Sequence, residues 1–292
     1  RLIASTSTQD IGNGARSVLA NTVAGAFGLE PQEIEARVGD SSLPEGAMAG
    51  GSRSTATIVP SALAAADRLK EEVRRRSNRP VEDKTDWRAV IGGMPDINVT
   101  AGRPPDRAAV RGITSPLDAA GMMGTVFKWI LRRFAHLETG SGAPSAVQVA
   151  EVEVDTLLGR VRVLRVHSGL AVGRLAAPQL ARSQAEGSII QGVGYALYEG
   201  RQIDQASGQV LTTGLEDYRI PGIADTPEMD IHFDDWGFEH VPGGAVGLGE
   251  VATLPVAAAI ANAVHNATGA RPHEIPMRPD RLLAALNGGR GS

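Results

Sequence analysis

The chain has 292 residues, a formal net charge of −4 and 42% hydrophobic residues, which is enough for two packed domains or one large one. The small negative charge argues against nucleic acid or an anionic membrane as a partner, and no apolar run reaches membrane-spanning length. Because cysteine is absent, structural disulfides, cysteine-ligated zinc and cysteine-ligated iron–sulfur clusters are excluded within this chain.

The first elements predict a strand, a glycine turn and a helix. Residues 2–8 alternate apolar and small polar side chains, as in a half-buried strand. This strand looks already under way at the first residue, so we expect a part of a longer chain or a split subunit. Residues 9–14 form the turn, and the helix after it ends at Gly28. Such a turn can present backbone N–H groups to a phosphate, but any tight strand–helix turn also favours glycine, so both interpretations stay open.

A second strand and a second small-residue loop follow. Residues 33–38 read as the strand, and residues 46–55 form a loop rich in glycine, alanine and serine that opens a helix over 57–76. Prolines then interrupt the region between about 77 and 140, which predicts an irregular, partly helical insertion.

The next part predicts a β-hairpin and a glycine-containing helix. Residues 147–154 alternate, and residues 161–166 return after a turn. The helix over 183–200 has glycines in its body, each of which costs about 1 kcal/mol relative to alanine, so we expect close packing against that face. Gln191 stands among these glycines. It is either a buried amide that bonds the backbone or a group that contacts a ligand.

The last part holds the candidate base. After a hairpin at 202–211 and a strand at 229–233, four glycines precede a carboxylate in the stretch Gly243–Glu250. An apolar, alanine-rich run over 251–264 predicts a buried helix directly after Glu250. Glu250 would then lie at the N-terminus of that helix, either as a fixed base or only as a helix-start acid. A terminal helix is expected over 276–286.

Several other kinds of site lack support. The six histidines include no pair at i,i+3 or i,i+4, and no H-E-x-x-H occurs, so zinc or iron held by protein side chains is not expected. No G-x-S-x-G motif supports a serine hydrolase, and neither a Rossmann fingerprint nor a Walker loop is present.

These motifs together are similar to a known family. Thr8–Ser17 with Gly12-Asn13-Gly14, the small-residue loop Ala49–Thr55, and Glu186–Gly194 followed by Gly247-Leu248-Gly249-Glu250 stand in the family's order. On these residues the chain resembles the C-terminal half of the molybdenum-binding large subunit of the xanthine dehydrogenase/aldehyde oxidase family. The resemblance covers nearly the whole chain apart from about 77–140. In two places the chain departs from the family: Asn13 replaces a glutamine, and no basic residue shortly precedes the G-x-G-E motif.

The resemblance implies a cofactor and the residues that hold it. The cofactor is molybdopterin, in bacteria usually the cytosine dinucleotide form, and the pterin rather than protein side chains holds the molybdenum. Glu250 matches the family's general base, and Gln191 matches its glutamine near the molybdenum. The residues that would contact the cofactor are Gln9, Gly12, Asn13, Gly14, Gly50, Gly51, Ser52, Ser54, Gln191, Gly192 and Gly249.

The resemblance also implies a function and partners. The function is hydroxylation of an aldehyde or N-heterocycle, a small-molecule substrate, with oxygen from water. Electrons pass to [2Fe–2S] clusters and often FAD on partner subunits or domains. The N-terminal half of the large subunit would be a further partner, and we expect this portion to be inactive alone. The alternative is a non-catalytic cofactor-binding or assembly fragment. Such enzymes are cytoplasmic or, in some bacteria, periplasmic.

The fold expected from these elements is α+β, with two mixed-sheet subdomains, helices on one side of each sheet and the cofactor between them. We expect a first subdomain over 1–78, the insertion or linker over 79–140, and a subdomain over 141–292 that carries the catalytic glutamate.

Overall fold

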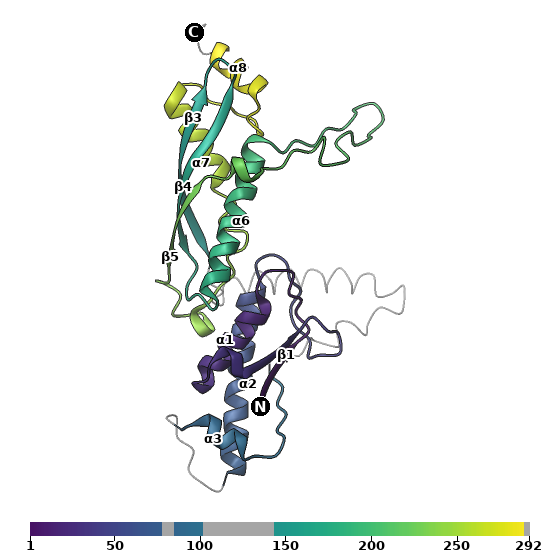
Figure 1. Ribbon diagram of the computed structural model, residues 1–292, viewed down its shortest axis with the longest axis vertical. Coiled ribbons are helices and arrows are strands. Elements are labelled where there is room, and N and C mark those ends of the chain that lie inside the picture. Colours follow the sequence, from purple (N-terminus) through teal and green to yellow (C-terminus); the bar gives the residue numbers. More distant parts are fainter. Residues whose placement is uncertain (78–84, 102–142, 289–292) are drawn as a thin grey trace, which may run out of the picture. The chain divides into compact units, whose positions relative to one another are not determined.

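The computed structural model describes residues 1–77, 85–101 and 143–288. The expected α+β class is confirmed, because small sheets combine with helices (Figure 1). The chain divides into two compact units. Unit 1 consists of Arg1–Ala143, Val172–Leu180 and Asp235–Gly247, and unit 2 consists of Pro144–Ala171, Ala181–Asp234 and Leu248–Ser292.

Two segments of the expected 141–292 subdomain, 172–180 and 235–247, are therefore part of unit 1. Most of the expected insertion at 79–140 lies outside the described residues. Its described part contains helix α3 (Trp87–Gly92), which begins after Asp86. The aspartate side chain accepts hydrogen bonds from the backbone N–H groups of Arg88 and Ala89, as an N-cap residue does.

Unit 1 begins with a strand–helix–strand arrangement. Strands β1 (Leu2–Thr6) and β2 (Ile34–Val38) pair in parallel, and helix α1 (Ala15–Phe27) connects them. The helix ends at Gly28 as predicted, because this glycine adopts a left-handed conformation (φ 64°) and its N–H bonds the carbonyl of Ala24. This sheet is a parallel pair among the described residues, whereas the sheet of unit 2 is mixed.

The core of unit 1 lies between α1 and helix α2 (Ser54–Arg76). Phe27 at the end of α1 meets Trp87 of α3 edge to face, with ring centroids 5.5 Å apart. The ammonium of Lys70 lies 5.4 Å from the Phe27 centroid and 5.7 Å from the Trp87 centroid, so its charge covers this aromatic pair. These contacts join α1, α2 and α3 to one another.

Unit 2 is built on a three-stranded sheet in the order β3-β4-β5. Strands β3 (Ser145–Asp155) and β4 (Arg160–Ala171) form the predicted antiparallel hairpin, and β5 (Glu228–Asp234) runs parallel to β4. Helix α7 (Val256–Thr268) packs along β3. Helix α8 (Pro279–Gly288) lies against the β3–β4 turn, where a Cβ added to Gly159 would come 2.5 Å from the carbonyl oxygen of Pro279.

Helix α6 (Pro178–Leu197) carries the glycines whose close packing was predicted, and at Gly192 the prediction is confirmed. A Cβ on Gly192 would lie 2.5 Å from the Cβ of Val256 at the start of α7. After α6 the chain extends into the predicted hairpin, where Ile203 bridges Val210 (Figure 1). In the described parts of the chain, no helix has the length and apolar character needed to cross a membrane.

Candidate functional site

Two loops of unit 1 are joined side by side where β1 ends and before α2 begins. The backbone N–H of Ser7 donates to the carbonyl of Pro44 (2.8 Å), and the N–H of Gly46 donates to the Ser7 hydroxyl (2.9 Å). A Cβ on Gly46 would overlap the hydroxyls of Thr6 and Thr8, so only glycine fits there. The two predicted small-residue segments, 9–14 and 46–55, are therefore neighbours, although the chain between them forms α1 and β2.

Two of the predicted cofactor-contacting side chains, Gln9 and Asn13, also form hydrogen bonds between these loops. Gln9 accepts a hydrogen bond through its Oε1 from the N–H of Ala49 (3.0 Å). Asn13 donates from Nδ2 to the Ser54 hydroxyl (3.0 Å). Because each amide bonds the opposite loop, both side chains are held in place before any ligand arrives.

Asp10 organises the glycine turn and was missed by the sequence reasoning. Its Oδ1 accepts from the N–H groups of Gly12 (3.1 Å) and Gly14 (3.2 Å), and its Oδ2 accepts from Arg16 (3.0 Å). The N-cap residue Gly14 has no side chain, so the carboxylate four residues earlier takes over the capping. An acid two residues before a G-x-G turn and a helix was the available signal.

A third segment reaches the small-residue loop at Gly247. In this loop Gly51 and Ser52 both have positive φ angles, 63° and 52°, which is a strained conformation for a serine. A Cβ on Gly247 would overlap the carbonyl oxygen of Ser52, so the two backbones are in direct contact. Three separate stretches of unit 1 thus meet around residues 50–54.

Gln191 lies on α6 in unit 2 and is exposed, so the alternative of a buried amide bonded to the backbone is wrong. Its Nε2 donates to the hydroxyl of Tyr195, one helical turn further along, at 2.7 Å. Its neighbour Gly192 is buried against Val256. The helix therefore presents the amide outward while its glycine face packs inward.

The predicted position of Glu250 at a helix N-terminus is wrong. Residues 249–255 are turns, and α7 begins only at Val256 with Pro255 as its N-cap residue. The side chain of Glu250 is exposed rather than buried. What holds this turn is Ser188 of α6, whose hydroxyl donates to the carbonyl of Gly249 at 2.6 Å.

The structure thus groups the predicted site residues in two sets. One set belongs to unit 1 and the other to unit 2. In unit 2, Ser188 and Gly192 connect the helix of Gln191 to the turn of Glu250 and to the start of α7. Unit 1 contains Gln9, Gly12, Asn13, Gly14, Gly50, Gly51, Ser52 and Ser54, and unit 2 contains Gln191, Gly192, Gly249 and Glu250.

A tyrosine cluster at the end of α6 was also not predicted. The Tyr218 hydroxyl donates to Glu199 Oε2 (2.7 Å), and the Tyr198 hydroxyl donates to Asp225 Oδ1 (3.1 Å). The guanidinium of Arg219 lies 4.2 Å from the Tyr198 ring centroid. Burial, with the Asp225 charge and hydrogen bond adding to it, raises the pKa of Tyr198 to about 12. These contacts fasten the segment after the hairpin to the helix that carries Gln191.

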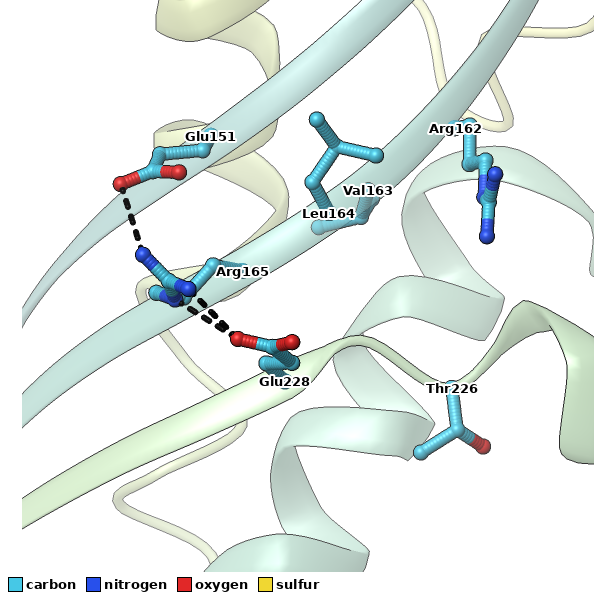
Figure 2. A pocket seen from close by; sticks show the side chains of 7 residues that line it. All are labelled: Glu151, Arg162, Val163, Leu164, Arg165, Thr226 and Glu228. Carbon is cyan, nitrogen blue, oxygen red and sulfur yellow. Dashed lines mark hydrogen bonds and ion pairs between the residues drawn. The ribbon is translucent and has the colours of Figure 1, made fainter.

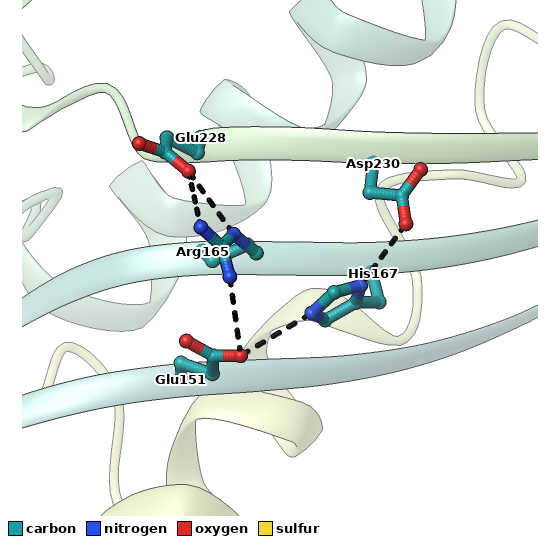
Figure 3. A network of polar contacts seen from close by, with 5 residues as sticks. All are labelled: Glu151, Arg165, His167, Glu228 and Asp230. Atoms are coloured by element: carbon teal, nitrogen blue, oxygen red, sulfur yellow. Dashed lines mark hydrogen bonds and ion pairs between the residues drawn. The ribbon is translucent and has the colours of Figure 1, made fainter.

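The outward face of the sheet in unit 2 carries a shallow polar hollow of about 300 Å³ (Figure 2). At its centre Arg165 binds Glu228 at 2.6 Å and Glu151 at 3.7 Å, and these partners raise the pKa of the guanidinium. His167 lies between Glu151 (3.3 Å) and Asp230 (3.2 Å) in the same network (Figure 3). Because Arg165 pairs with carboxylates and His167 bonds two acidic side chains across the strands, the face is best explained as a solvated cross-strand polar network.

No metal site emerges from this network. Among the residues that the structure describes, no three histidine or acidic side chains form a group that could hold a metal ion.

Three comparisons place the chain among known proteins. The aldehyde oxidoreductase molybdenum-binding subunit PaoC of Escherichia coli (strain K12) is 32% identical over 283 residues, which cover 96% of this chain and 36% of that protein. The 6-hydroxypseudooxynicotine dehydrogenase complex subunit gamma of Paenarthrobacter nicotinovorans is 27% identical over 302 residues, or 99% of this chain and 36% of that protein. Quinoline 2-oxidoreductase from Pseudomonas putida 86 has a similar fold, with a TM-score of 0.70 at 21% identity over 98% of this chain and 36% of that chain.

The chain spans 36% of the length of these curated relatives. The resemblance to part of a molybdenum-binding subunit is confirmed by the first of them. The family model of the molybdopterin cofactor-binding domain matches residues 1–227, which is most of the chain. The chain belongs to the molybdopterin cofactor-binding domain family.

Proposed function

We propose that this chain is the cofactor-holding, catalytic portion of a molybdenum hydroxylase that oxidises an aldehyde or N-heterocycle with oxygen from water. Relatives named as an aldehyde oxidoreductase subunit and as xanthine dehydrogenase subunits support this reaction class. The observation that carries the proposal is the convergence of three small-residue segments around residues 50–54. Glycines and short polar side chains allow several backbones to approach one extended ligand.

The residues of unit 1 fit a pterin nucleotide. A Cβ added to Gly12 would have no atom within 4 Å, so a ligand can approach this side of the turn. Gln9 and Asn13 supply amide groups that match the donors and acceptors of a pterin ring. Arg53, whose Nε donates to the carbonyl of Gly50 (3.1 Å), brings a positive charge suited to phosphates. We infer that the nucleotide is the cytosine dinucleotide form.

In unit 2, Glu250 and Gln191 would serve the reaction. The bound cofactor supplies oxygen transfer and two-electron oxidation at molybdenum. The carboxylate of Glu250 would accept a proton as oxygen is transferred to the substrate carbon. The amide of Gln191, oriented by Tyr195, would donate a hydrogen bond near the reacting oxygen. The Ser188–Gly249 hydrogen bond would keep the Glu250 turn in place relative to α6.

The remaining parts of the enzyme would lie outside this chain. We propose that an N-terminal portion of the large subunit completes the substrate pocket. An iron–sulfur subunit, and in some assemblies an FAD subunit, would accept the electrons. The 36% coverage of the relatives also supports the second candidate, a fragment that binds the cofactor or assists assembly without turning over by itself.

The test is the Glu250→Gln variant in the complete enzyme assembly. We expect turnover of aldehydes and N-heterocycles to fall by about 10²-fold or more, because a general base contributes about that much. Molybdenum, measured by mass spectrometry, and CMP released by acid hydrolysis should stay near stoichiometric. Glu153→Gln, on an exposed position of β3, is the matched control and should keep normal turnover. Normal turnover by the Glu250→Gln variant would show that Glu250 is not the general base.

A further inference from the structure

The backbone N–H groups at the start of α1 already donate hydrogen bonds to side chains of the protein itself. The N–H groups of Gly12, Gly14 and Arg16 donate to the carboxylate of Asp10 at 3.0–3.2 Å. The N–H of Ala15 donates to Oδ1 of Asn13 at 3.4 Å. Two side chains therefore satisfy four of the backbone donors of this glycine turn and helix start.

This arrangement changes what the turn can bind. A helix N-terminus with free N–H groups attracts an anion, because the donors and the helix dipole both favour negative charge. Here the carboxylate of Asp10 is that anion. A phosphate could use the same donors only by displacing Asp10, and the two negative charges would repel each other.

We propose that Asp10 is a positioning residue that occupies the main-chain donors of the turn, so that the amide side chains of Gln9 and Asn13, rather than backbone N–H groups, contact the cofactor. An amide NH₂ carries two hydrogens, and the bond from Asn13 to Ser54 uses one of them. Gln9 accepts from Ala49 through its oxygen, which directs its NH₂ away from that bond. This inference rests on the proposed function for the identity of the ligand.

The first experiment uses the cofactor-free 292-residue chain with inorganic phosphate as the probe. Asp10→Ala should uncover the donors, so phosphate should bind at least about tenfold more tightly than to the parent chain, because hydrogen bonds to charged groups are stronger than those between neutral groups. Hydrogen exchange read by NMR should show phosphate protecting the amides of Gly12, Gly14 and Arg16 in the variant only. Equal protection in the parent chain, or no gain in Asp10→Ala, would overturn the proposal.

Two further variants separate positioning from ordinary stabilisation. Asp86→Ala removes another aspartate that caps a helix in unit 1, so it should lower thermal stability without any gain in phosphate binding. Asp10→Asn keeps one acceptor oxygen but places an NH₂ group opposite Arg16, so the Arg16 amide should exchange faster while the chain still folds. An unchanged Arg16 amide in Asp10→Asn would contradict the geometry.

In the complete assembly, Asp10→Ala should reduce the molybdenum and pterin content several-fold, whereas Asp86→Ala should not. If the parent assembly contains no molybdenum, the proposed function fails, yet the phosphate experiment on the cofactor-free chain still decides the role of Asp10. Full cofactor content in Asp10→Ala would show that the turn does not need its carboxylate for the cofactor.

Discussion

The backbone of Gly247 lies against the carbonyl oxygen of Ser52 so closely that a single added carbon would overlap that oxygen. Ser52 itself has a positive φ angle, so neither side of this contact can relax easily. Gly247 thus packs within unit 1, whereas Gly249 and Glu250 belong to unit 2. One short motif contributes to both units.

Gly247→Ala should therefore be strongly destabilising. We expect the free energy of unfolding to fall by about 1–3 kcal/mol, the usual cost of overpacking, because a backbone oxygen cannot rotate away. Denaturant unfolding would measure the change. Gly25→Ala is the control: it lies in α1 with no atom within 4 Å of an added Cβ, so it should stabilise the chain by about 0.5–1 kcal/mol. Similar values for the two variants would refute the contact.

Helix α6 offers a matched pair of glycines. Gly192→Ala should lower the free energy of unfolding by about 1–3 kcal/mol, because the new methyl group meets the branched side chain of Val256. Gly187→Ala in the same helix meets no atom within 4 Å and should raise it by about 0.5–1 kcal/mol. The prediction fails if Gly192→Ala is neutral in thermal and chemical unfolding.

Ser188→Ala tests how the Glu250 turn is held. The buried hydroxyl donates to the carbonyl of Gly249, so its loss should cost about 1 kcal/mol of stability. If Glu250 is the base, turnover of the complete assembly should fall while its molybdenum content stays normal. Ser17→Ala, on the first turn of α1, is a suitable control for a serine with no part in this turn. Unaltered turnover in Ser188→Ala would mean that the turn keeps its position without this bond.

Alkaline titration can examine the tyrosine cluster directly, because the chain contains three tyrosines and all lie between residues 195 and 218. The pKa of Tyr198 rises from an ordinary 10.0 to about 12 in the folded chain. The associated stability is therefore present below about pH 10 and is lost as the pH rises through about 12. Absorbance at 295 nm should show a late step near pH 12 that is missing in Tyr198→Phe. A complete titration by pH 11 would contradict the buried environment.

Low pH should also reduce the stability that the tyrosine cluster contributes. Burial works to raise the pKa of Asp225, but bonds from Gly222 N–H, the Tyr198 hydroxyl and Arg219 outweigh it and hold the pKa below its ordinary value. This stability is present above the unfolded pKa and is lost as the pH falls through the lower folded pKa. Asp225→Asn should remove that part of the acid dependence, as followed by unfolding at several pH values. An identical acid profile would exclude Asp225 as its source.

Local sequence patterns predicted much of the fold. The alternation in β3 and β4 and the glycine that ends α1 act over a few residues, so the printed sequence contains their full signal. The parallel pairing of β5 with β4 and the return of 235–247 to unit 1 depend on partners far away in the chain. Alternation shows that a strand exists but does not identify its neighbour.

The candidate site shows the same limit. The alanine-rich run after Glu250 suggested a continuous helix, but Pro255 lacks an N–H and is favoured at a helix start, and α7 begins at Val256. That signal was present in the sequence and overlooked. The exposure of Gln191 and its bond to Tyr195 could not be predicted, because the pattern of glycines indicates close packing without showing which side chain faces outward.

The chain passes from one unit to the other five times, since each unit is assembled from three separate segments. If two related genes recombined at a single point, at least one unit of the resulting protein would therefore contain segments from both genes. Mixed parentage would put mismatched residues at contacts such as Ser52 with Gly247. Neither unit can therefore be exchanged between relatives as one continuous gene segment.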